Sequence, residues 1–409
     1  MKDPLEESSA EVTRRGAGVS LLILLAGLIL LAIVRPSAIG TLAIIFGIVA
    51  LIMAHEAGHY FTAKRAGMKV TEFFLGFGPR VWSFRRGETE YGVKAIPAGG
   101  YVRIVGMTNL EEVDPADEPR TYRQAKFSKR LTVVVAGVSV NIVLAYFLLF
   151  GAVAGQGIPK LTTKIDEVVA DSPARAAGLE KGDRIVAVDG QRVADWQDLP
   201  KTIENRAGVP TAFTIDRNGT LVELQITPER RSSTDSSGFI GVSPRSEYER
   251  YSLVGSFGQS FVVMWDTTKA TGEGLGRFFS PAGLERYSKN FTGDEPTSGS
   301  GSSSDRPVSI IGIVDQGGSI VGGNVWALLG LLGIINLVVA LFNLIPLPPF
   351  DGGHAAVAIY EQIASKVRRR RVRVDYRKLI PVTAIVLIVF LTLGLSAMFL
   401  DVRRIFTGS

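Results

Sequence analysis

Residues 38–59, AIGTLAIIFGIVALIMAHEAGH, determine what kind of protein this chain forms. The first part, residues 38–54, contains no charged side chain. A helix needs about 20 mostly apolar residues to cross the hydrocarbon core of a bilayer. The stretch therefore predicts a membrane-spanning helix that ends in ionisable residues, and such residues within a span are rare and usually functional.

The ionisable residues form the motif His55-Glu56-Ala57-Gly58-His59, which contains two of the three histidines in the chain. Residues four apart share one face of a helix, so both imidazoles can bind one Zn²⁺. Glu56 then lies beside a coordinated water and can act as its general base. The alternative is a helix with functionless polar residues, which the apolar surroundings disfavour. The spacing predicts a catalytic zinc site.

A catalytic zinc ion usually has three protein ligands and one open position. Asp351 and the remaining histidine, His354, both follow a proline-rich stretch at the end of a later apolar segment, and both are candidates for the third ligand. Asp351 could instead cap a helix, and His354 could be an ordinary helix residue. Gly352 and Gly353 let the backbone turn and approach the metal closely. The chemistry alone leaves both candidates open.

Four further apolar segments predict a polytopic α-helical membrane protein with about five transmembrane helices, at residues 18–34, 131–150, 325–345 and 380–400. The first of them, preceded by Arg14 and Arg15, also fits a signal peptide. Its apolar core is too long for one, and no clear cleavage site follows, so we expect a retained anchor.

Basic residues determine the predicted orientation. Those next to the spans fall on one side of a five-span topology: Arg14, Arg15, Lys64, Arg65, Lys69, Lys126, Lys129, Arg130 and Arg368 to Arg371. This side is expected to be cytoplasmic, which places residues 151–324 outside. The formal charge of +6 is thus explained by topology, and no nucleic-acid partner is expected because no aromatic platform accompanies the basic runs. The chain has no cysteine, which excludes disulfides, thiolate nucleophiles and cysteine-based zinc sites.

The segments between the spans suggest smaller folded regions. Residues 73–106 are rich in glycine and aromatic residues, and they predict cytoplasmic β-hairpins at the membrane. An exposed strand edge there could bind an extended substrate, although a purely structural sheet is an equal alternative.

Residues 165–228 resemble a single PDZ domain, with turn glycines around an apolar strand and a hairpin at Asn218-Gly219. Residues 251–279 predict an interfacial amphipathic helix, and residues 292–305 a flexible loop.

At this point the motifs resemble those of the site-2 protease family of intramembrane zinc metalloproteases, in its bacterial RseP-like form. The matching motifs are His55-Glu56-x-x-His59, Asn343-x-x-Pro346, Asp351-Gly352, Glu72 to Gly78, Pro97 to Val102 and Ala136-Gly137-x-x-x-Asn141. Two features depart from the family pattern. The span before Ala38 is additional, and Phe350 replaces the usual leucine before Asp351.

The resemblance implies a role for each site residue. His55, His59 and Asp351 are the zinc ligands, and Glu56 is the catalytic carboxylate. Asn343 and Asn141 help to hold the substrate or the developing oxyanion. His354 and Gly352 lie near the site without binding the metal.

The resemblance also implies the function: a zinc metalloendopeptidase of the bacterial cytoplasmic membrane that cleaves transmembrane segments of single-span proteins. The implied substrates are anti-sigma factors after a first cut, or remnant signal peptides, in regulated intramembrane proteolysis. The extracytoplasmic PDZ domain is a size filter or a peptide-binding module. One alternative is an inactive PDZ membrane scaffold. A metal transporter is disfavoured because the ligands cluster at one end of the spans.

The predicted organisation, in chain order, is an N-terminal tail with the additional span (1–36), the HExxH span (37–66), the cytoplasmic β region (67–130), a span (131–155), the PDZ domain (156–232), a linker with the amphipathic helix and flexible loop (233–324), one transmembrane helix with Asn343 and Asp351 (325–360), a basic cytoplasmic loop (361–378) and the last span with the tail (379–409).

Overall fold

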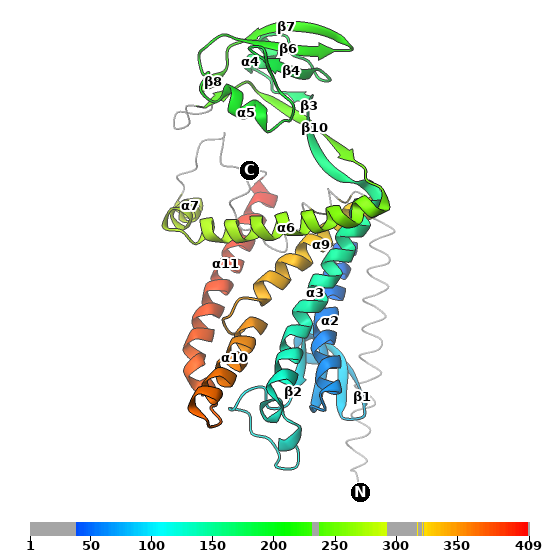
Figure 1. Cartoon of the computed structure of the whole chain (residues 1–409), viewed down its shortest axis with the longest axis vertical. Helices are drawn as coiled ribbons and strands as arrows, with labels where there is room; N and C mark the ends of the chain where they lie inside the picture. The colour runs from blue at the N-terminus through cyan, green and yellow to red at the C-terminus, as the bar shows by residue number, and fades with distance from the viewer. Residues whose placement is uncertain (1–37, 231–236, 293–316, 318–320, 322, 408–409) are drawn as a thin grey trace. The chain divides into compact units, whose positions relative to one another are not determined.

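The computed structural model describes residues 38–230, 237–292, 317, 321 and 323–407 (Figure 1). The chain divides into two compact units, which are described separately. The first, the membrane unit, comprises Met1–Ala152, Phe257–Gly272 and Pro307–Ser409, and the second comprises Val153–Ser256 and Glu273–Arg306. The predicted span at 18–34 and all but the first residue of the predicted loop at 292–305 lie outside the described residues.

Within the described residues, 4 helices are long and apolar enough to cross a membrane, and they coincide with four of the predicted spans. They are α2 (Ala38–Arg65), α3 (Phe127–Gln156), α9 (Val325–Asn343) and α11 (Ile380–Thr407), the last preceded by the 3-10 turn η4 (Tyr376–Leu379). Helix α2 continues for more than a turn beyond His59, so the whole His55–His59 motif is helical.

The predicted region at 325–360, given as one segment with a transmembrane helix, contains two helices in the structure. Helix α9 ends at Asn343, and a separate helix, α10 (Asp351–Arg368), begins eight residues later. The connecting segment contains Pro346, Pro348 and Pro349, which lack the backbone N–H that a helix interior requires. Helix α10 also extends into the segment predicted to be a basic loop at 361–378. As a result, Asp351 lies in the first turn of a new helix.

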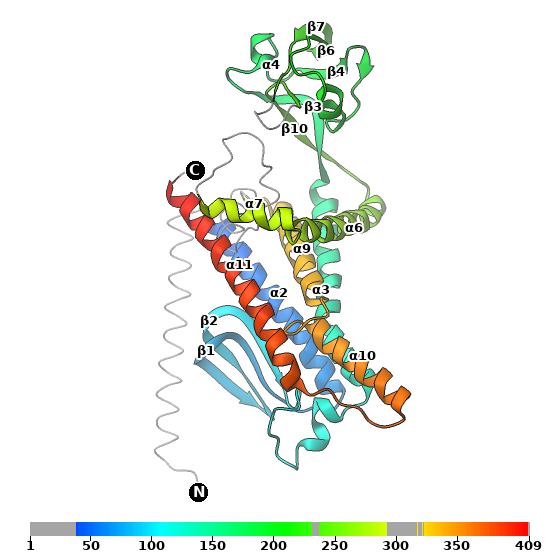
Figure 2. The same ribbon diagram turned by 90° about the vertical axis from the view of Figure 1, so that its left-hand side faces the viewer.

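The predicted cytoplasmic hairpins form a curled antiparallel sheet from β1 (Val70–Arg86) and β2 (Thr89–Ile104), which packs against α2 (Figure 2). Both strands bend, β1 at Gly76 with a positive φ of 87°, so each strand supplies two segments. Residues 72–75 pair with residues 90–93 on one side and with residues 100–103 on the other. The segment from Gly100 to Ile104 is therefore an edge of this sheet.

The predicted amphipathic segment forms one helix, α6 (Leu253–Phe278), followed by α7 (Pro281–Thr292). In the membrane unit α6 crosses α3 at a steep angle (Figure 1). The rings of Phe257 and Phe261 lie 5.4 and 4.4 Å from that of Tyr146 on α3, measured between centroids. Val262 and Trp265 remain exposed, as expected of a helix at a bilayer interface.

The second unit contains a 6-stranded antiparallel sheet in the order β10-β3-β4-β6-β7, with β5 paired to β4. The strands are β3 (Ile158–Val168), β4 (Arg184–Val188), β5 (Gln191–Arg192), β6 (Thr211–Arg217), β7 (Thr220–Ile226) and β10 (Val242–Glu249). The short helices are α4 (Pro173–Ala176) and α5 (Asp198–Ile203), and a small pair of strands is formed by β8 (Glu229–Arg230) and β9 (Gly238–Phe239). Leu199, Phe213 and Ile215 belong to its buried core.

This arrangement fits the predicted PDZ domain, including its predicted hairpin, but the domain is longer than predicted. The hairpin of β6 and β7 turns at Asn218-Gly219, where both residues have positive φ, as a two-residue type I′ turn requires. Strand β10 adds to β3 beyond residue 232, so the domain extends past its predicted end. The pairing of β10 with β3 joins segments far apart in the sequence, which local patterning does not reveal.

A buried ion pair stabilises this unit and makes it sensitive to acid. Asp183 is 2% exposed and accepts hydrogen bonds from Arg217 at 2.8 and 2.7 Å and from the Glu180 amide at 2.8 Å. Burial raises the pKa of Asp183, but the bonds from Arg217 and the Glu180 amide outweigh burial, so the pKa lies below its ordinary value. The stabilisation is complete above the unfolded-state pKa of about 3.9 and is lost as the pH falls through the folded-state pKa.

We expect Asp183→Asn to lower the free energy of unfolding of this unit by about 2 kcal/mol near neutral pH, because Arg217 loses its charged partner. Hydrogen exchange of the β4 and β6 amides in the full chain measures the change. Asp195→Asn is the control, since Asp195 and its partner Lys160 are both more than half exposed, and we expect less than about 0.5 kcal/mol there. Equal effects of the two variants would contradict the role given to Asp183.

Candidate metal centre

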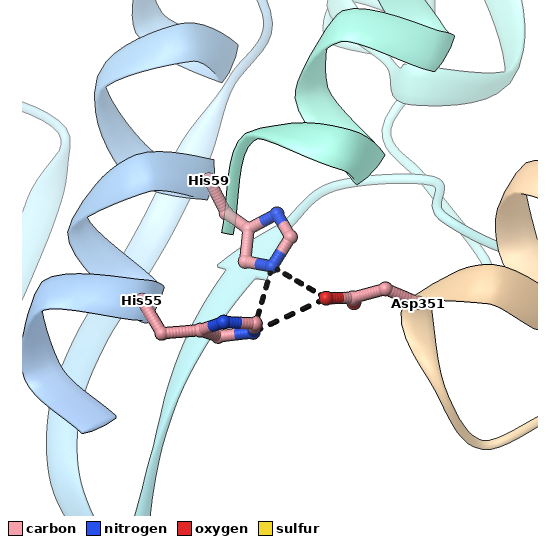
Figure 3. Close-up of side chains that lie close together, drawn as sticks. All are labelled: His55, His59 and Asp351. Atoms are coloured by element: carbon pink, nitrogen blue, oxygen red, sulfur yellow. Dashed lines mark hydrogen bonds and ion pairs between the residues drawn. The ribbon is translucent and has the colours of Figure 1, made fainter. Parts of the chain in front are cut away.

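Three side chains from distant parts of the chain meet in the membrane unit: His55 and His59 of α2 and Asp351 of α10 (Figure 3). Asp351 Oδ2 lies 3.1 Å from His55 Nε2 and 3.2 Å from His59 Nε2, and the two Nε2 atoms are 3.2 Å apart. Both histidines are buried. Four-residue spacing on α2 places the two imidazoles on one face, and the break before α10 brings the carboxylate to them.

The triangle of ligand atoms has the dimensions of a zinc site. Ligands bonded to Zn²⁺ at about 2.0–2.1 Å in tetrahedral directions are about 3.3–3.4 Å apart, close to the observed separations. His59 Nδ1 lies 2.7 Å from the Val133 carbonyl oxygen, to which it donates. When the ring is neutral, this bond places the proton on Nδ1 and leaves the lone pair of Nε2 free to bind a metal. The arrangement of these electron-rich atoms therefore suits a bound cation.

Helix α3 packs its backbone directly against the two imidazoles at Gly137. A Cβ atom on Gly137 would lie 2.3 Å from His59 Nε2 and 2.8 Å from His55 Nε2, both far inside contact distance. On the facing helix α2, a Cβ on Gly58 would lie 2.9 Å from the Ala136 carbonyl oxygen, which is also too close. The two glycines let α2 and α3 approach closely, so that α3 forms one wall of the site.

Glu56 points toward the edge segment of the sheet. Its carboxyl lies near the backbone of Val102 and within electrostatic range of both histidines and Asp351. A Cβ on Gly100 would lie 3.2 Å from Glu56 Cγ, so glycine is needed for the strand to come this close. The carboxylate is half-buried between the three ligand residues and an extended strand. This is where a general base would have to lie to act on a peptide held along that strand.

The remaining predicted site residues occupy different surroundings. Asn141, one turn beyond Gly137 on α3, is 1% exposed, and its carbonyl oxygen accepts a 2.7 Å hydrogen bond from Asn336 Nδ2 of α9. Asn343 is the half-buried last residue of α9. His354 follows Asp351 on α10, but it does not belong to the three-residue group, and its ring centroid lies 6.1 Å from that of Tyr376.

Gly352 and Gly353 approach their own preceding loop. Cβ atoms there would lie 2.4 Å from the Ile345 carbonyl oxygen and 2.4 Å from the Pro348 nitrogen, respectively. The two glycines therefore let residues 344–348 fold over the first turn of α10. Sequence reasoning had them approach the metal instead, whereas in the structure they fix the loop that precedes Asp351.

Two features escaped the sequence reasoning. Asn336 is 2% exposed and joins α9 to α3, as described above. Arg130 of α3 and Glu361 of α10 form a buried ion pair at 2.6 Å and are 6% and 5% exposed. The pair fixes α10 against α3 just past the middle of α10. The signal for Glu361 was its position seven residues after His354, which places the two on nearly the same face of α10.

Comparison with known proteins agrees with these observations. The model of peptidase family M50 matches residues 43–391. Zinc metalloprotease Rip1 of Mycolicibacterium smegmatis is 34% identical over 86% of this chain and 94% of its own length. Metalloprotease MmpA of Caulobacter vibrioides is 28% identical over 80% of this chain and 87% of its own. A solved PDZ domain of an SdrC-like protein from Listeria monocytogenes covers 20% of this chain and 84% of its own, at 22% identity and a TM-score of 0.18.

The family match spans all four described candidate helices, at least in part, and includes the three ligand residues and Glu56. The similarity to Rip1 extends over nearly the whole length of both chains. The chain therefore belongs to peptidase family M50, the site-2 protease family, and is a zinc metalloprotease.

Proposed function

We propose that this zinc metalloprotease hydrolyses peptide bonds in or next to the transmembrane segments of single-span proteins in a bacterial cytoplasmic membrane. His55, His59 and Asp351 hold the Zn²⁺, and Glu56 is the general base. The observation that supports the proposal most strongly is the 3.1–3.2 Å triangle of ligand atoms, which joins the candidate membrane helix α2 to α10 and has a carboxylate beside it.

The chemistry follows from the surroundings of these residues. When bound, the ion polarises the scissile carbonyl and lowers the pKa of a coordinated water. Glu56 accepts a proton from the attacking water and returns it to the leaving amine nitrogen. The close approach of the strand at Gly100 places the Glu56 carboxyl at the strand edge, near the Val102 backbone. Asn141 and Asn343 help to hold the substrate, and His354 and Gly352 support the segment that carries Asp351.

The edge segment from Gly100 to Ile104 supports an extended substrate. A transmembrane helix hides its backbone bonds, so a protease must unwind it before hydrolysis. Strand addition at a sheet edge holds a peptide extended through main-chain hydrogen bonds. Residues 100–103 pair with residues 72–75 on one side, and no described strand pairs with their other side. This edge lies beside Glu56, so the added strand would pass the ligand residues.

The proposed orientation places the metal centre toward the cytoplasm and the PDZ domain outside. Lys64 and Arg65 end α2, and Lys129 near the start of α3 donates to the Ala66 carbonyl oxygen at 2.8 Å, so these basic ends lie together. Basic residues favour the cytoplasmic side. An extracytoplasmic PDZ domain would exclude proteins that retain a large ectodomain. The proposed substrates are thus trimmed single-span proteins, such as anti-sigma factors after a first cut, or remnant signal peptides.

The test is cleavage of one single-span substrate in two forms, with its ectodomain intact and with the ectodomain removed, by the full chain in lipid vesicles. We expect the trimmed form to be cut at least about tenfold faster, and we expect chelation to stop cleavage and added zinc to restore it. Mass spectrometry of the products identifies the bond. Equal cleavage of both forms would contradict the size filter, and absence of cleavage from several trimmed substrates would favour an inactive scaffold.

A further inference from the structure

A basic pocket lies in the membrane unit, at the end where α3 begins, α10 ends and α11 begins. Its cavity volume is about 240 Å³, and its lining includes Arg123, Arg130, Glu361, Arg371, Arg373 and Tyr376. The metal-ligand residues do not line this pocket. Arg123 and Arg130 come from the segment before α3 and from α3 itself, and the others come from α10 and the segment that joins it to α11. The pocket is therefore assembled from three separate parts of the chain.

The pocket has more positive than negative charge. Arg123 is paired with Glu118, to which its Nε donates at 2.9 Å. Glu361 is shared between Arg130 at 2.6 Å and Arg373 at 3.4 Å. Arg371 contacts the Arg123 carbonyl oxygen at 3.4 Å and pairs with no carboxylate among the described residues. These four arginines thus have two carboxylate partners, Glu361 in the pocket lining and Glu118 outside it, which leaves a surplus of two positive charges in this set.

The guanidinium groups of the pocket are close enough to repel one another. Burial first, and then repulsion by Arg130 and Arg371, lower the pKa of Arg373 below its ordinary value. Like charges held together in a partly buried site are relieved by an anion between them. Arginine is also the side chain that binds phosphate with paired hydrogen bonds, because its guanidinium donors form a planar fork.

Two buried donors at the pocket lack partners. Arg130 is 6% exposed, and its Nε has no hydrogen-bond partner among the described residues. The same holds for the hydroxyl of Tyr376. Buried polar groups in folded proteins are nearly always hydrogen-bonded, but these two atoms are shielded from water and so lie behind the cavity wall. Among the lining residues, Arg371 and Arg373 are exposed, so their guanidinium groups are the donors open to a ligand. An anion with several oxygen atoms supplies acceptors to more than one donor at once.

The size and place of the pocket limit the kind of anion. Pockets for drug-sized ligands are about 300–1,000 Å³, so a cavity of about 240 Å³ accepts a head group more readily than a whole nucleotide. Arg130 is the fourth residue of α3, and Tyr376 begins the last candidate span. Residues at the ends of spanning helices lie at the depth of the lipid head groups. The phosphate of a lipid in the same leaflet is thus within reach of the pocket.

We propose that this basic pocket binds a phosphate group, supplied by an anionic phospholipid of the cytoplasmic leaflet. The bound phosphate bridges Arg130 of α3 to Arg371 and Arg373 after α10. It would thereby join the helix that carries Gly137 to the segment that follows the helix carrying Asp351. This role is independent of peptide hydrolysis and does not require the metal.

The test measures phosphate binding by the full-length chain in a nonionic detergent. Calorimetric titrations use three probes: dioctanoyl phosphatidylglycerol, dioctanoyl phosphatidylcholine and inorganic phosphate. We expect one phosphatidylglycerol per chain, with phosphatidylcholine at least about tenfold weaker because its choline offsets the phosphate charge. We expect the double variant Arg371→Gln with Arg373→Gln to weaken phosphatidylglycerol binding by at least about tenfold. Inorganic phosphate should compete only weakly.

A matched control keeps the change of charge the same. Arg370→Gln with Arg377→Gln removes two positive charges outside the pocket lining, and it should leave the affinity within about twofold. Equal losses in the two double variants, or binding that does not saturate, would overturn the proposal. Tight binding of inorganic phosphate would support a phosphate site but would overturn the proposal that a phospholipid supplies the phosphate. If the first double variant unfolds at a lower temperature than the wild type, the single variant Arg371→Gln decides, because Arg371 contacts only a backbone carbonyl oxygen.

Discussion

Replacing Glu56 with glutamine is expected to lower the rate of peptide hydrolysis about 10³-fold, within a range of about 10²–10⁴, while the protein still binds one zinc ion. Glutamine has nearly the same shape as glutamate, but it cannot accept the proton of the attacking water. The three ligand atoms belong to His55, His59 and Asp351, so the change leaves them intact. The measurement combines cleavage of a trimmed single-span substrate with the zinc content of the purified protein.

The control for this experiment is Glu90→Gln. Glu90 lies on the same sheet, where it accepts hydrogen bonds from Ser83 and Arg80 away from the ligand residues. We expect its cleavage rate to stay within about threefold of the wild type, because exposed or partly exposed ion pairs contribute little. A Glu56→Gln protein that retains zinc and cleaves at the wild-type rate would remove Glu56 from the mechanism.

The substitution Gly137→Ala, which adds a single methyl group to the site, is expected to cause a large loss of zinc affinity. The new methyl group would lie 2.3 Å from His59 Nε2, where no methyl group fits, so the imidazole or helix α3 must move. His59 cannot turn aside without losing its bond to the Val133 carbonyl oxygen. We expect zinc affinity to fall at least about 100-fold, the upper end of the loss that follows when groups supporting a metal ligand are changed. Zinc competition with a fluorescent chelator measures the affinity.

Gly330→Ala is a matched control, because Gly330 also lies in an apolar helix of the membrane unit. A Cβ there would lie 3.5 Å from the Ala152 Cβ, an ordinary contact, so we expect zinc affinity to be unchanged. The thermal unfolding of both metal-free variants shows whether the fold is preserved. If Gly137→Ala binds zinc as tightly as the wild type, the close approach of α3 does not matter for the metal centre.

The parts of this site that local spacing determines were predictable from the sequence. Two histidines four residues apart share a helix face wherever the helix lies, so His55 and His59 required no tertiary information. Asp351 was different. The residues alone did not distinguish it from His354 as the third zinc ligand, and only the family resemblance favoured it. The structure brings Asp351 to the two histidines, since a new helix begins at Asp351 itself.

Features that arise between distant segments were not predictable. Gly137 belonged to a recognised motif, yet its contact with both imidazoles depends on how closely α2 and α3 pack. The ion pair of Arg130 and Glu361 joins residues 231 positions apart, and β10 completes the second sheet from beyond the expected boundary. The break after Asn343 is a different case, because its three prolines were visible and argued against a continuous helix.

The proposed ligand set is divided between α2 and α10, and this division would determine when the enzyme can first act. Asp351 is 292 positions after His59. At about 5–20 residues per second, a ribosome needs roughly 15–60 s to synthesise that distance. During this interval the nascent chain already has its histidine pair in the bilayer, among many other newly inserted proteins, but the third ligand does not yet exist. Translation therefore provides a delay during which an incomplete copy cannot damage its neighbours.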